Sequence, residues 1–255
     1  MKYDTTAMIL AAGLGTRLKS LTHDKPKALV ELNGKPLLQH CIENLTDNGF
    51  HHIVINVHHF ADKIRKYLSD NDFGLDMKIS DESSELLETG GGIAYARELL
   101  LPSEEPFLVH NVDILSNLDI PWFRTCMRPD ALATLLVSER QTQRYLLFRP
   151  EDMRLVGWTN ISTGEVKSPY KDLDPSACLR FAFSGIHNIS PSIFGVFDEM
   201  GLSGRFPIMD FYLSVCERYP IFGVAVPELK IVDVGKLDSL AQAEKFVTML
   251  PGWTG

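Results

Sequence analysis

The 255-residue chain contains 45% hydrophobic and 23% charged residues, an ordinary composition for a folded globular protein of one large or two small domains. Its formal net charge of −8 argues against a nucleic-acid partner, because nucleic acids are bound by basic patches. The chain shows no signal-peptide pattern and no run near the roughly 18 apolar residues of a membrane span. Four scattered cysteines without a CxxC pair predict reduced thiols, so we expect a cytoplasmic protein that contacts no membrane.

The first half of the chain alternates between strand-like and helix-like segments. Apolar, β-branched runs predict strands at residues 6–11, 53–57, 77–79 and 106–111. Apolar residues at helical spacing predict helices after Pro36, over residues 61–68 and over residues 93–101. This alternation is typical of a parallel sheet covered on both faces, in which ligands bind beyond the carboxyl ends of the strands. The loops after Ala11, Ile79 and Asn111 should therefore meet at one cleft.

The second half changes character at about residue 131. Residues 131–189 contain short strands and turns without a long helix, which predicts an antiparallel insertion that forms the far wall of the cleft. A helix is then expected near residues 207–218, followed by strands over 221–226 and 231–234 and a last helix over 237–250. The paired histidines on either side of the 53–57 strand are interpreted as turn residues.

A glycine turn follows the first strand, at residues 13–18 (GLGTRL). The turn begins like the dinucleotide-binding pattern GxGxxG, but Leu18 replaces the third glycine. The Walker pattern fails as well, because Leu18 and Lys19 stand where Gly-Lys is needed. A dehydrogenase and a P-loop enzyme are therefore disfavoured.

Two cations accompany the turn, Arg17 within it and Lys27 ten residues later. Glycine lets backbone N–H groups approach phosphate oxygens, and nearby cations neutralise the charge that develops when pyrophosphate leaves. The pattern suits a nucleoside triphosphate. The alternative interpretation is a plain tight turn with two solvated surface cations.

Two aspartates stand at strand ends, Asp113 after the 106–111 strand and Asp233 within the 231–234 strand. Carboxylate oxygens suit Mg²⁺, which takes one or two protein carboxylates and keeps several waters. Alternatively, each aspartate caps a strand end or a following helix.

The run from Leu10 to Leu38, LAAGLGTRLKSLTHDKPKALVELNGKPLL, resembles the signature of sugar-1-phosphate nucleotidyltransferases. Members of that family join a nucleoside triphosphate to a sugar 1-phosphate and release pyrophosphate. The resemblance implies a Rossmann-like three-layer α/β/α fold with a mixed, mostly parallel central sheet and a small β-rich acceptor lobe. It also implies a single domain over residues 1–255, with a nucleotide-binding half at 1–130 and a sugar-phosphate-binding half at 131–255.

The resemblance further implies which residues form the site. It assigns catalysis to Arg17, Lys27 and Asp113, and a Mg²⁺ ion to Asp113 and Asp233. Nucleotide binding is implied for the first strand end, the glycine turn and the ETGGGI loop, namely Leu10, Ala11, Ala12, Gly13, Gly15, Thr16, Glu88, Thr89, Gly90, Gly91 and Gly92. Sugar-phosphate binding is implied for Asn111, Ser184 and Gly185.

Two features of the chain depart from the family pattern. Val112 replaces the usual glycine before Asp113. The Glu-Lys-Pro segment whose lysine holds the sugar phosphate in many relatives is missing, so Lys167, or else Lys171, is the expected substitute. The three glycines of the ETGGGI loop are expected to let a flat base lie against the backbone.

The substrates are left partly open by the sequence. The ETGGGI form resembles uridylyltransferases that act on N-acetylmuramic acid 1-phosphate, and similar loops occur in guanylyltransferases for mannose or heptose 1-phosphates. UTP or GTP with a sugar 1-phosphate are thus the expected partners. A non-catalytic nucleotide-sugar sensor is the alternative from another class, and the oligomeric state does not follow from the sequence.

Overall fold

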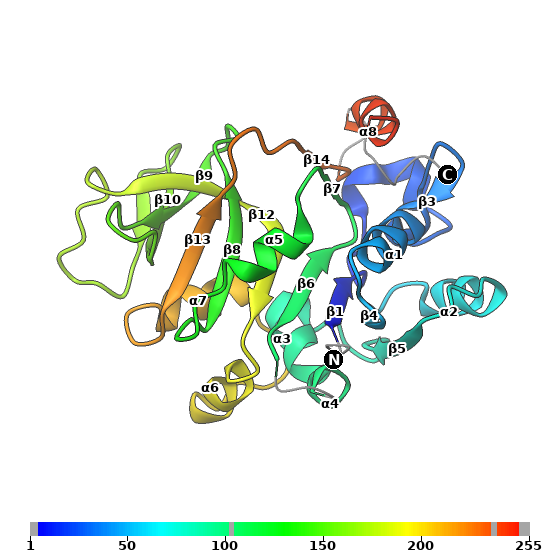
Figure 1. Ribbon diagram of the computed structural model, residues 1–255, viewed down its shortest axis with the longest axis horizontal. Helices are drawn as coiled ribbons and strands as arrows, with labels where there is room; N and C mark the ends of the chain where they lie inside the picture. Colours follow the sequence, from blue (N-terminus) through cyan, green and yellow to red (C-terminus); the bar gives the residue numbers. More distant parts are fainter. Residues whose placement is uncertain (1–4, 102–104, 236–238, 250–255) are drawn as a thin grey trace.

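The computed structural model describes residues 5–101, 105–235 and 239–249, and a central sheet crosses the whole molecule (Figure 1). In the described part of the chain, this sheet has ten strands in the order β11-β10-β9-β12-β6-β1-β4-β5, with β8 paired to β12 and β13 paired to β8. The bounds of these strands are β1 Thr6–Leu10, β4 His52–Val57, β5 Asp76–Asp81, β6 Phe107–Asn111, β8 Ala133–Ser138, β9 Arg144–Phe148, β10 Leu155–Asn160, β11 Glu165–Lys167, β12 Leu179–Ile189 and β13 Ile221–Ala225.

Shorter elements complete the fold. Two small strand pairs lie outside the central sheet, β2 (Glu31–Leu32) with β3 (Lys35–Pro36) and β7 (Ile114–Ser116) with β14 (Ile231–Asp233). The 3₁₀ helices are η1 (Thr16–Thr22) and η2 (Lys27–Leu29). The α-helices are α1 Leu37–Asp47, α2 Ala61–Asp70, α3 Glu88–Tyr95, α4 Arg97–Leu100, α5 Ile120–Thr125, α6 Ile193–Glu199, α7 Ile208–Val215 and α8 Leu240–Val247.

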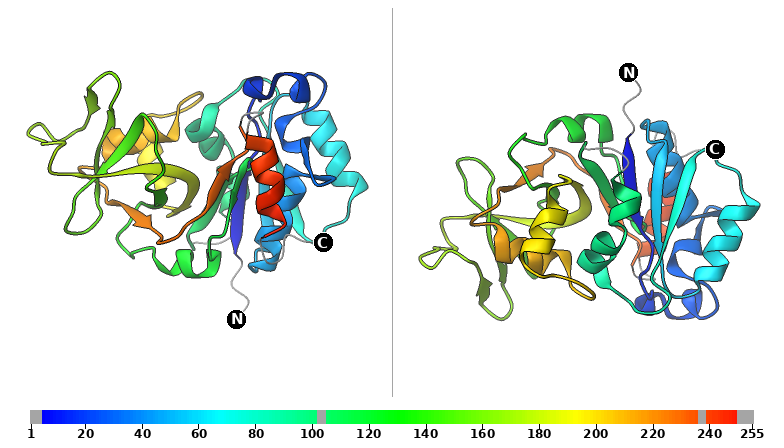
Figure 2. Two further views of the ribbon diagram at one scale, coloured as in Figure 1. Left: turned by 90° about the horizontal axis from the view of Figure 1, so that it is seen from above. Right: turned by 90° about the horizontal axis from the view of Figure 1, so that it is seen from below.

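Each face of the sheet carries its own hydrophobic core. In β1, Ala7 and Ile9 join one core while Met8 joins the other, as the alternation of side chains along a strand requires. Helices α1, α2, α5 and α8 contribute to the first core, and α3, α4, α6 and α7 contribute to the second (Figure 2). The predicted three-layer α/β/α fold is confirmed.

The strands β6, β1, β4 and β5 run parallel. Leu10, at the end of β1, pairs with Asn56 of β4 on one side and with Asn111 of β6 on the other. The carboxyl ends of three neighbouring strands therefore lie at one edge of the sheet. The loops that leave this edge supply the site described below.

The predicted antiparallel insertion extends the same sheet. The eleven-residue strand β12 pairs antiparallel with β6 at one end and with β9 at the other. Strands β8 to β11 are in this way attached to the parallel strands, and they form the β-rich part of the molecule at the left of Figure 1.

Some elements differ from the sequence-based expectation. Helix α3 begins at Glu88 and includes the three glycines, although the helix was expected only after them. The helices α5 and α6 and the strand β7 were not predicted, since segments of three to seven residues are too short for a periodic pattern to be distinctive. Helix α8 ends at Val247, and the expected bounds of that helix, 237 and 250, lie outside the described residues.

His52 also differs from expectation, since it belongs to β4 and is buried. Its Nδ1 lies 2.7 Å from Asp76 Oδ2, and its Nε2 lies 2.8 Å from the carbonyl oxygen of Leu99. The ring therefore links β4 to its neighbours and is not a turn residue.

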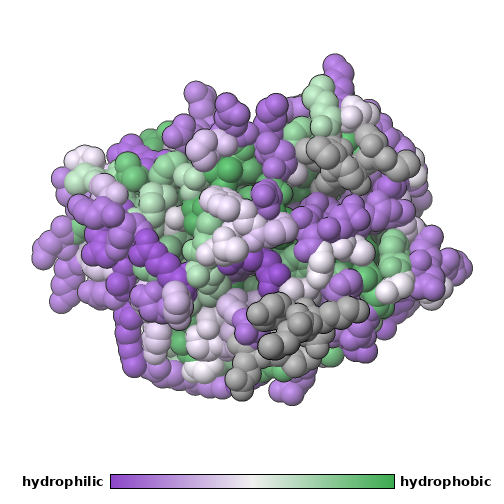
Figure 3. Space-filling view, viewed as in Figure 1, coloured by the Kyte–Doolittle hydropathy of each residue, from purple (hydrophilic) through white to green (hydrophobic). Residues whose placement is uncertain are grey.

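The surface is mixed in character. On the face in Figure 3, hydrophilic residues occupy most of the outline, and hydrophobic residues show mainly toward the middle. Within the described ranges, no helix combines the length and the apolar character needed to cross a lipid bilayer.

Candidate active site

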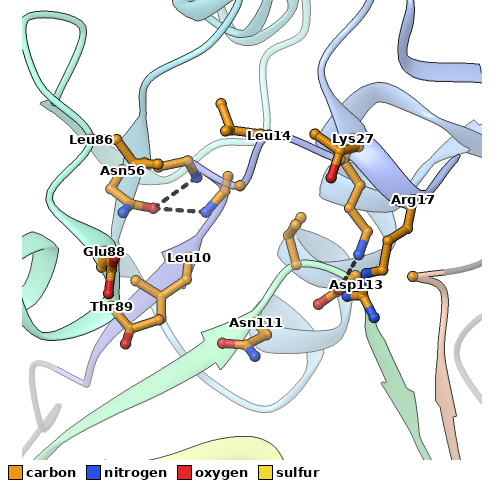
Figure 4. Close-up of a pocket in the computed structure, with 17 residues that line it drawn as sticks. Leu10, Leu14, Arg17, Lys27, Asn56, Leu86, Glu88, Thr89, Asn111 and Asp113 are labelled. Atoms are coloured by element: carbon orange, nitrogen blue, oxygen red, sulfur yellow. Dashed lines mark hydrogen bonds and ion pairs between the residues drawn. The ribbon is translucent and has the colours of Figure 1, made fainter. Parts of the chain in front are cut away.

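A cavity of about 460 Å³ opens at the carboxyl ends of β1, β4 and β6 (Figure 4). Figure 4 shows two ends to this cavity, with Lys27, Arg17 and Asp113 at one and Glu88 and Thr89 at the other. The residues that line it are Leu10, Ala11, Ala12, Gly13, Leu14, Gly15, Thr16, Arg17, Lys27, Asn56, Leu86, Glu88, Thr89, Asn111, Val112, Asp113 and Gly235. The structure thus brings together most of the residues expected from the sequence.

The glycine turn shapes one wall of the cavity. Gly15 has a φ of 65°, in the left-handed region, and η1 begins directly after it. Its carbonyl oxygen accepts hydrogen bonds from the amide of Leu18 and the hydroxyl of Thr22, each at 2.9 Å. A Cβ atom at Gly15 would lie 3.2 Å from Cβ of Lys27. Glycine at this position therefore allows the turn to fold closely against the lysine.

Lys27 and Asp113 form an ion pair at the end of the cavity. The ammonium group of Lys27 donates to Oδ2 of Asp113, and the lysine side chain is only 9% exposed. Lys27 begins η2 directly after Pro26, whose extended backbone sets the direction of the chain. A buried cation is thereby aimed at the place where β6 ends.

A short strand pairing brings Asp233 close to Asp113. Asp233 of β14 pairs with Ile114 of β7, and the amide of Val234 donates to the carbonyl oxygen of Asp113 at 2.9 Å. This small ladder holds residues 113 and 233 side by side although they are far apart in the chain. The sequence does not show this pairing.

The Asp233 carboxylate has the character of a metal ligand. Its Oδ1 atom is buried, and none of the described residues offers it a hydrogen bond. A buried carboxylate oxygen without a partner is costly, unless a cation satisfies it. Two hard oxygen donors from Asp113 and Asp233 fit Mg²⁺, which uses few protein ligands. In the described part of the chain, no group of three or more metal-binding side chains gathers.

Arg17 lies beside the same aspartate. A Cβ atom added to Gly235 would stand 2.6 Å from Oδ1 of Asp233 and 3.0 Å from a terminal nitrogen of Arg17. Gly235 thus leaves the space that both charged groups occupy. The arginine, the lysine and the two aspartates form one charged cluster.

Strand β12 approaches Asn111 at the end of β6. Gly185 has a φ of 76° and lies where the pairing of β12 with β8 shifts register. A Cβ atom there would stand 2.9 Å from Nδ2 of Asn111 and 2.8 Å from Ile114. The expected neighbourhood of Asn111 and Gly185 is therefore present. Ser184 is buried, and its hydroxyl lies 3.3 Å from that of Ser138.

Lys167 does not lie with these residues. It ends β11, the outermost strand of the β-rich part, and its ammonium group lies 5.3 Å from the ring centre of Trp158. Lys171, the other candidate for the missing lysine, lines a different cavity. Lys167 does not line the cavity, because the β10–β11 hairpin places it on the outermost strand of the sheet.

The ETGGGI loop is also arranged differently from the expectation. Glu88 and Thr89 line the cavity, but Gly90, Gly91 and Gly92 are buried within α3 and do not. The amides of Gly90 and Gly91 donate to the carbonyl oxygen of Phe206 at 2.9 and 3.1 Å. The three glycines therefore allow close packing of α3 against the 204–206 segment, rather than an open platform for a base.

Substitution at Gly91 tests this packing role. A Cβ atom there would stand 2.1 Å from the carbonyl oxygen of Gly204, so we expect Gly91→Ala to destabilise the fold by about 2 kcal/mol or more, because an overpacked core must shift its backbone. For a chain of this size, thermal unfolding should then fall by about 4–8 °C.

Gly195 offers a matched control, since it is an exposed glycine in α6 with open space around its Cβ position. Gly195→Ala should raise stability by about 0.5–1 kcal/mol, because alanine favours a helix. Equal melting temperatures for the two variants would contradict the packing role of Gly91.

Asn56 was missed by the sequence-based prediction. Its Oδ1 atom accepts hydrogen bonds from the amides of Ala11 and Ala12 at 2.7 and 3.3 Å. The available signal was a single polar residue inside the apolar strand IVINV, since a buried amide needs partners. Leu14, Leu86 and Gly235 also line the cavity and were not predicted.

The histidine next to the site is neutral. His110 precedes Asn111 in β6, and burial lowers the pKa of its ring to about 4. The imidazole therefore carries no charge near pH 7. It packs with Cys41, whose sulfur lies 3.5 Å from Nδ1 of the ring.

Comparison with known proteins agrees with this geometry. The family model described as nucleotidyl transferase matches residues 6–144. The chain is 48% identical over 246 residues to N-acetylmuramate alpha-1-phosphate uridylyltransferase of Caulobacter vibrioides, which covers 93% of this chain and 95% of that protein. It is 40% identical over 112 residues to mannose-1-phosphate guanyltransferase beta-B of Xenopus laevis, covering 44% of this chain and 31% of that protein.

A solved structure shows the same fold. The crystal structure of HddC from Yersinia pseudotuberculosis complexed with GMP-PN matches with a TM-score of 0.72 and 24% identity, over 95% of this chain and 99% of that one. At this level of identity, the likeness concerns the fold alone.

Proposed function

Because the chain belongs to the nucleotidyl transferase family, whose sugar-1-phosphate members transfer a nucleoside monophosphate to a sugar 1-phosphate, we propose that it transfers the uridylyl group of UTP to N-acetylmuramate 1-phosphate. The observation that supports nucleotidyl transfer is the group of Lys27, Arg17 and Asp113 at one end of the cavity, with Asp233 next to Arg17 behind the lining residue Gly235. The identity that extends over nearly the whole of the Caulobacter vibrioides uridylyltransferase supports the choice of base and sugar.

Each residue of the cluster has a separate role that depends on its position. Lys27 contacts the phosphates at the reacting centre, and Arg17 stabilises the departing β- and γ-phosphates. A sugar phosphate is already an anionic nucleophile, so attack on the α-phosphorus needs alignment and charge neutralisation more than a general base.

Asp113 and Asp233 would hold a Mg²⁺ ion in this proposal. Such an ion supplies positive charge to the phosphate oxygens and helps to orient them. The buried, unpartnered Oδ1 of Asp233 supports this assignment among the described residues.

In this proposal the nucleotide lies along the cavity, with its triphosphate near Lys27 and Arg17 and its base near Glu88 and Thr89. The turn from Ala11 to Thr16 receives the phosphates, and Glu88 and Thr89 lie at the end for the base. Arg205 holds the Glu88 carboxylate, with its Nε donating at 2.7 Å. Asn111 and Gly185 contribute to the acceptor side, where the sugar phosphate would bind.

A second candidate is a GTP-dependent guanylyltransferase for a mannose or heptose 1-phosphate. The 40% identity to a mannose-1-phosphate guanyltransferase over 112 residues favours it. A sensor that binds a nucleotide sugar without turnover is a further alternative, and the complete charged cluster argues against it.

The test is pyrophosphate release over a matrix of UTP, GTP, CTP and dTTP against N-acetylmuramate, mannose, glucose and N-acetylglucosamine 1-phosphates. The proposal predicts the highest kcat/KM for UTP with N-acetylmuramate 1-phosphate. A maximum with GTP would support the second candidate, and binding without turnover would support the sensor.

A cytoplasmic location belongs to the same proposal. All four cysteines are free in the structure, which suits a reducing compartment.

A further inference from the structure

Glu82 is a buried carboxylate close to the cavity, and the proposed transfer reaction does not use it. It lies just after β5, is 1% exposed and does not line the cavity. Its Oε1 atom accepts a hydrogen bond from Nδ2 of Asn56 at 2.7 Å, and its Oε2 atom accepts one from the amide of Leu87 at 3.3 Å. Burial raises the pKa of this carboxyl group, while these two hydrogen bonds lower it.

The two partners of Glu82 connect it to two different segments that line the cavity. Asn56 accepts from the amides of Ala11 and Ala12, which belong to the turn for the phosphates. Leu87 directly precedes Glu88 and Thr89 at the end for the base. A continuous chain of hydrogen bonds therefore runs from the amides of Ala11 and Ala12 through Asn56 and Glu82 to the amide of Leu87. We call the segment from Ala11 to Thr16 the phosphate turn and the segment from Leu87 to Thr89 the base loop.

The chemistry of the side chains fixes the direction of every bond in this chain. The Asn56 amide has one donating and one accepting end. A carboxylate only accepts, so it turns the NH₂ group of Asn56 toward itself and leaves Oδ1 for the two alanine amides. A glutamine at position 82 has one accepting oxygen and one donating NH₂ group. Its NH₂ group would therefore face either the amide of Leu87 or the NH₂ group of Asn56, which are both donors.

An independent feature keeps room for this carboxylate. A Cβ atom at Gly92 would stand 2.6 Å from Oε1 of Glu82 and 3.0 Å from Nδ2 of Asn56. The third glycine of the ETGGGI loop thus lies against the hydrogen bond between Glu82 and Asn56.

We propose that Glu82 is a positioning residue that ties the phosphate turn to the base loop, so that nucleotide affinity depends on a side chain that touches no nucleotide. The proposal rests on the proposed nucleotide site and names a determinant of its preorganisation.

The first test is Glu82→Gln, with Kd for the nucleotide measured by calorimetry in the absence of an acceptor. We expect affinity to fall about tenfold, because one of the two loops loses its fixed position. Removal of a negative charge near a triphosphate would by itself strengthen binding. Loss of positioning therefore predicts weaker nucleotide binding, whereas loss of charge alone predicts tighter binding. Unchanged or tighter binding would overturn the proposal.

The second test exchanges donor and acceptor. Asn56→Asp together with Glu82→Gln lets the introduced glutamine amide donate to the new carboxylate and accept from Leu87, while the carboxylate still accepts from Ala11 and Ala12. We expect the double variant to bind at least about threefold more tightly than Glu82→Gln alone, although it restores the negative charge closer to the phosphates. Equal or weaker binding would contradict the proposal, as would loss of folding in both variants.

A matched control is Glu85→Gln, an exposed carboxylate three positions away that does not line the cavity. Its Kd should stay within twofold of the unmodified protein. The nucleotide in all measurements is whichever of UTP and GTP the unmodified protein binds more tightly. A wrong choice of base in the proposed function would therefore leave this test intact.

Discussion

Asp233→Asn is expected to lower kcat/KM for nucleotidyl transfer about a thousandfold and to leave the fold intact. The Oδ1 atom of Asp233 is buried without a hydrogen-bond partner among the described residues, and the pairing of β14 with β7 places Asp233 opposite Ile114, the residue that follows Asp113. Removal of its charge weakens the hold on a metal that would neutralise phosphate charge, an effect of about 4 kcal/mol in the transition state.

Stability provides a second readout for the same variant. A buried carboxylate oxygen that accepts no hydrogen bond contributes little to the stability of the metal-free protein, so the neutral amide should leave the melting temperature in EDTA nearly unchanged. Added Mg²⁺ should raise the melting temperature of the unmodified protein but not that of the variant.

The control for this prediction is Asp130→Asn, which removes a carboxylate that is exposed and outside the cavity. It should change neither kcat/KM nor the response to Mg²⁺. An Asp233→Asn enzyme with more than a tenth of normal activity would contradict the metal role.

Lys27→Met is the second substitution with a large expected effect, a fall of about a thousandfold in kcat. Methionine keeps most of the volume of this buried side chain but removes the ammonium group that is paired with Asp113. A charge placed where the phosphates react stabilises the transition state more than the bound substrate, so kcat should fall more than KM rises. Steady-state kinetics with both substrates measures this split.

Lys25→Met is the matched control for Lys27→Met. Lys25 lies two positions earlier on the same loop and does not line the cavity, so the control removes the same charge from the neighbourhood. We expect a change of less than threefold in kcat. Equal losses in both variants would mean that general electrostatics, and not the position of Lys27, governs the rate.

The sequence predicted the end of the cavity that holds Arg17 and Lys27 better than the rest. Arg17 and Lys27 lie within one continuous signature, so their proximity to the glycine turn depends on local geometry. The strand–helix alternation likewise predicted the three layers, because it reflects the period of the apolar residues. Asp113 and Asp233 were selected as strand-end carboxylates, but only the β7–β14 ladder explains why they lie side by side.

The differences between the expected and the observed arrangement concern contacts between distant parts of the chain. The glycines of the ETGGGI loop were expected to face a base, whereas the 204–206 segment, far later in the chain, occupies the space next to Gly90 and Gly91. Lys167 was expected near the sugar phosphate, but the β10–β11 hairpin carries it to the outer edge of the sheet. Neither result could be predicted from local pattern, since both depend on tertiary packing.

The most direct test of the proposed function is a mixture of the protein, Mg²⁺, UTP and N-acetylmuramate 1-phosphate, analysed by mass spectrometry. The proposal predicts UDP-N-acetylmuramate and pyrophosphate in equal amounts, and a loss of both products with Asp233→Asn. Bound UTP that yields neither product, or a guanylylated sugar when GTP replaces UTP at higher kcat/KM, would contradict it.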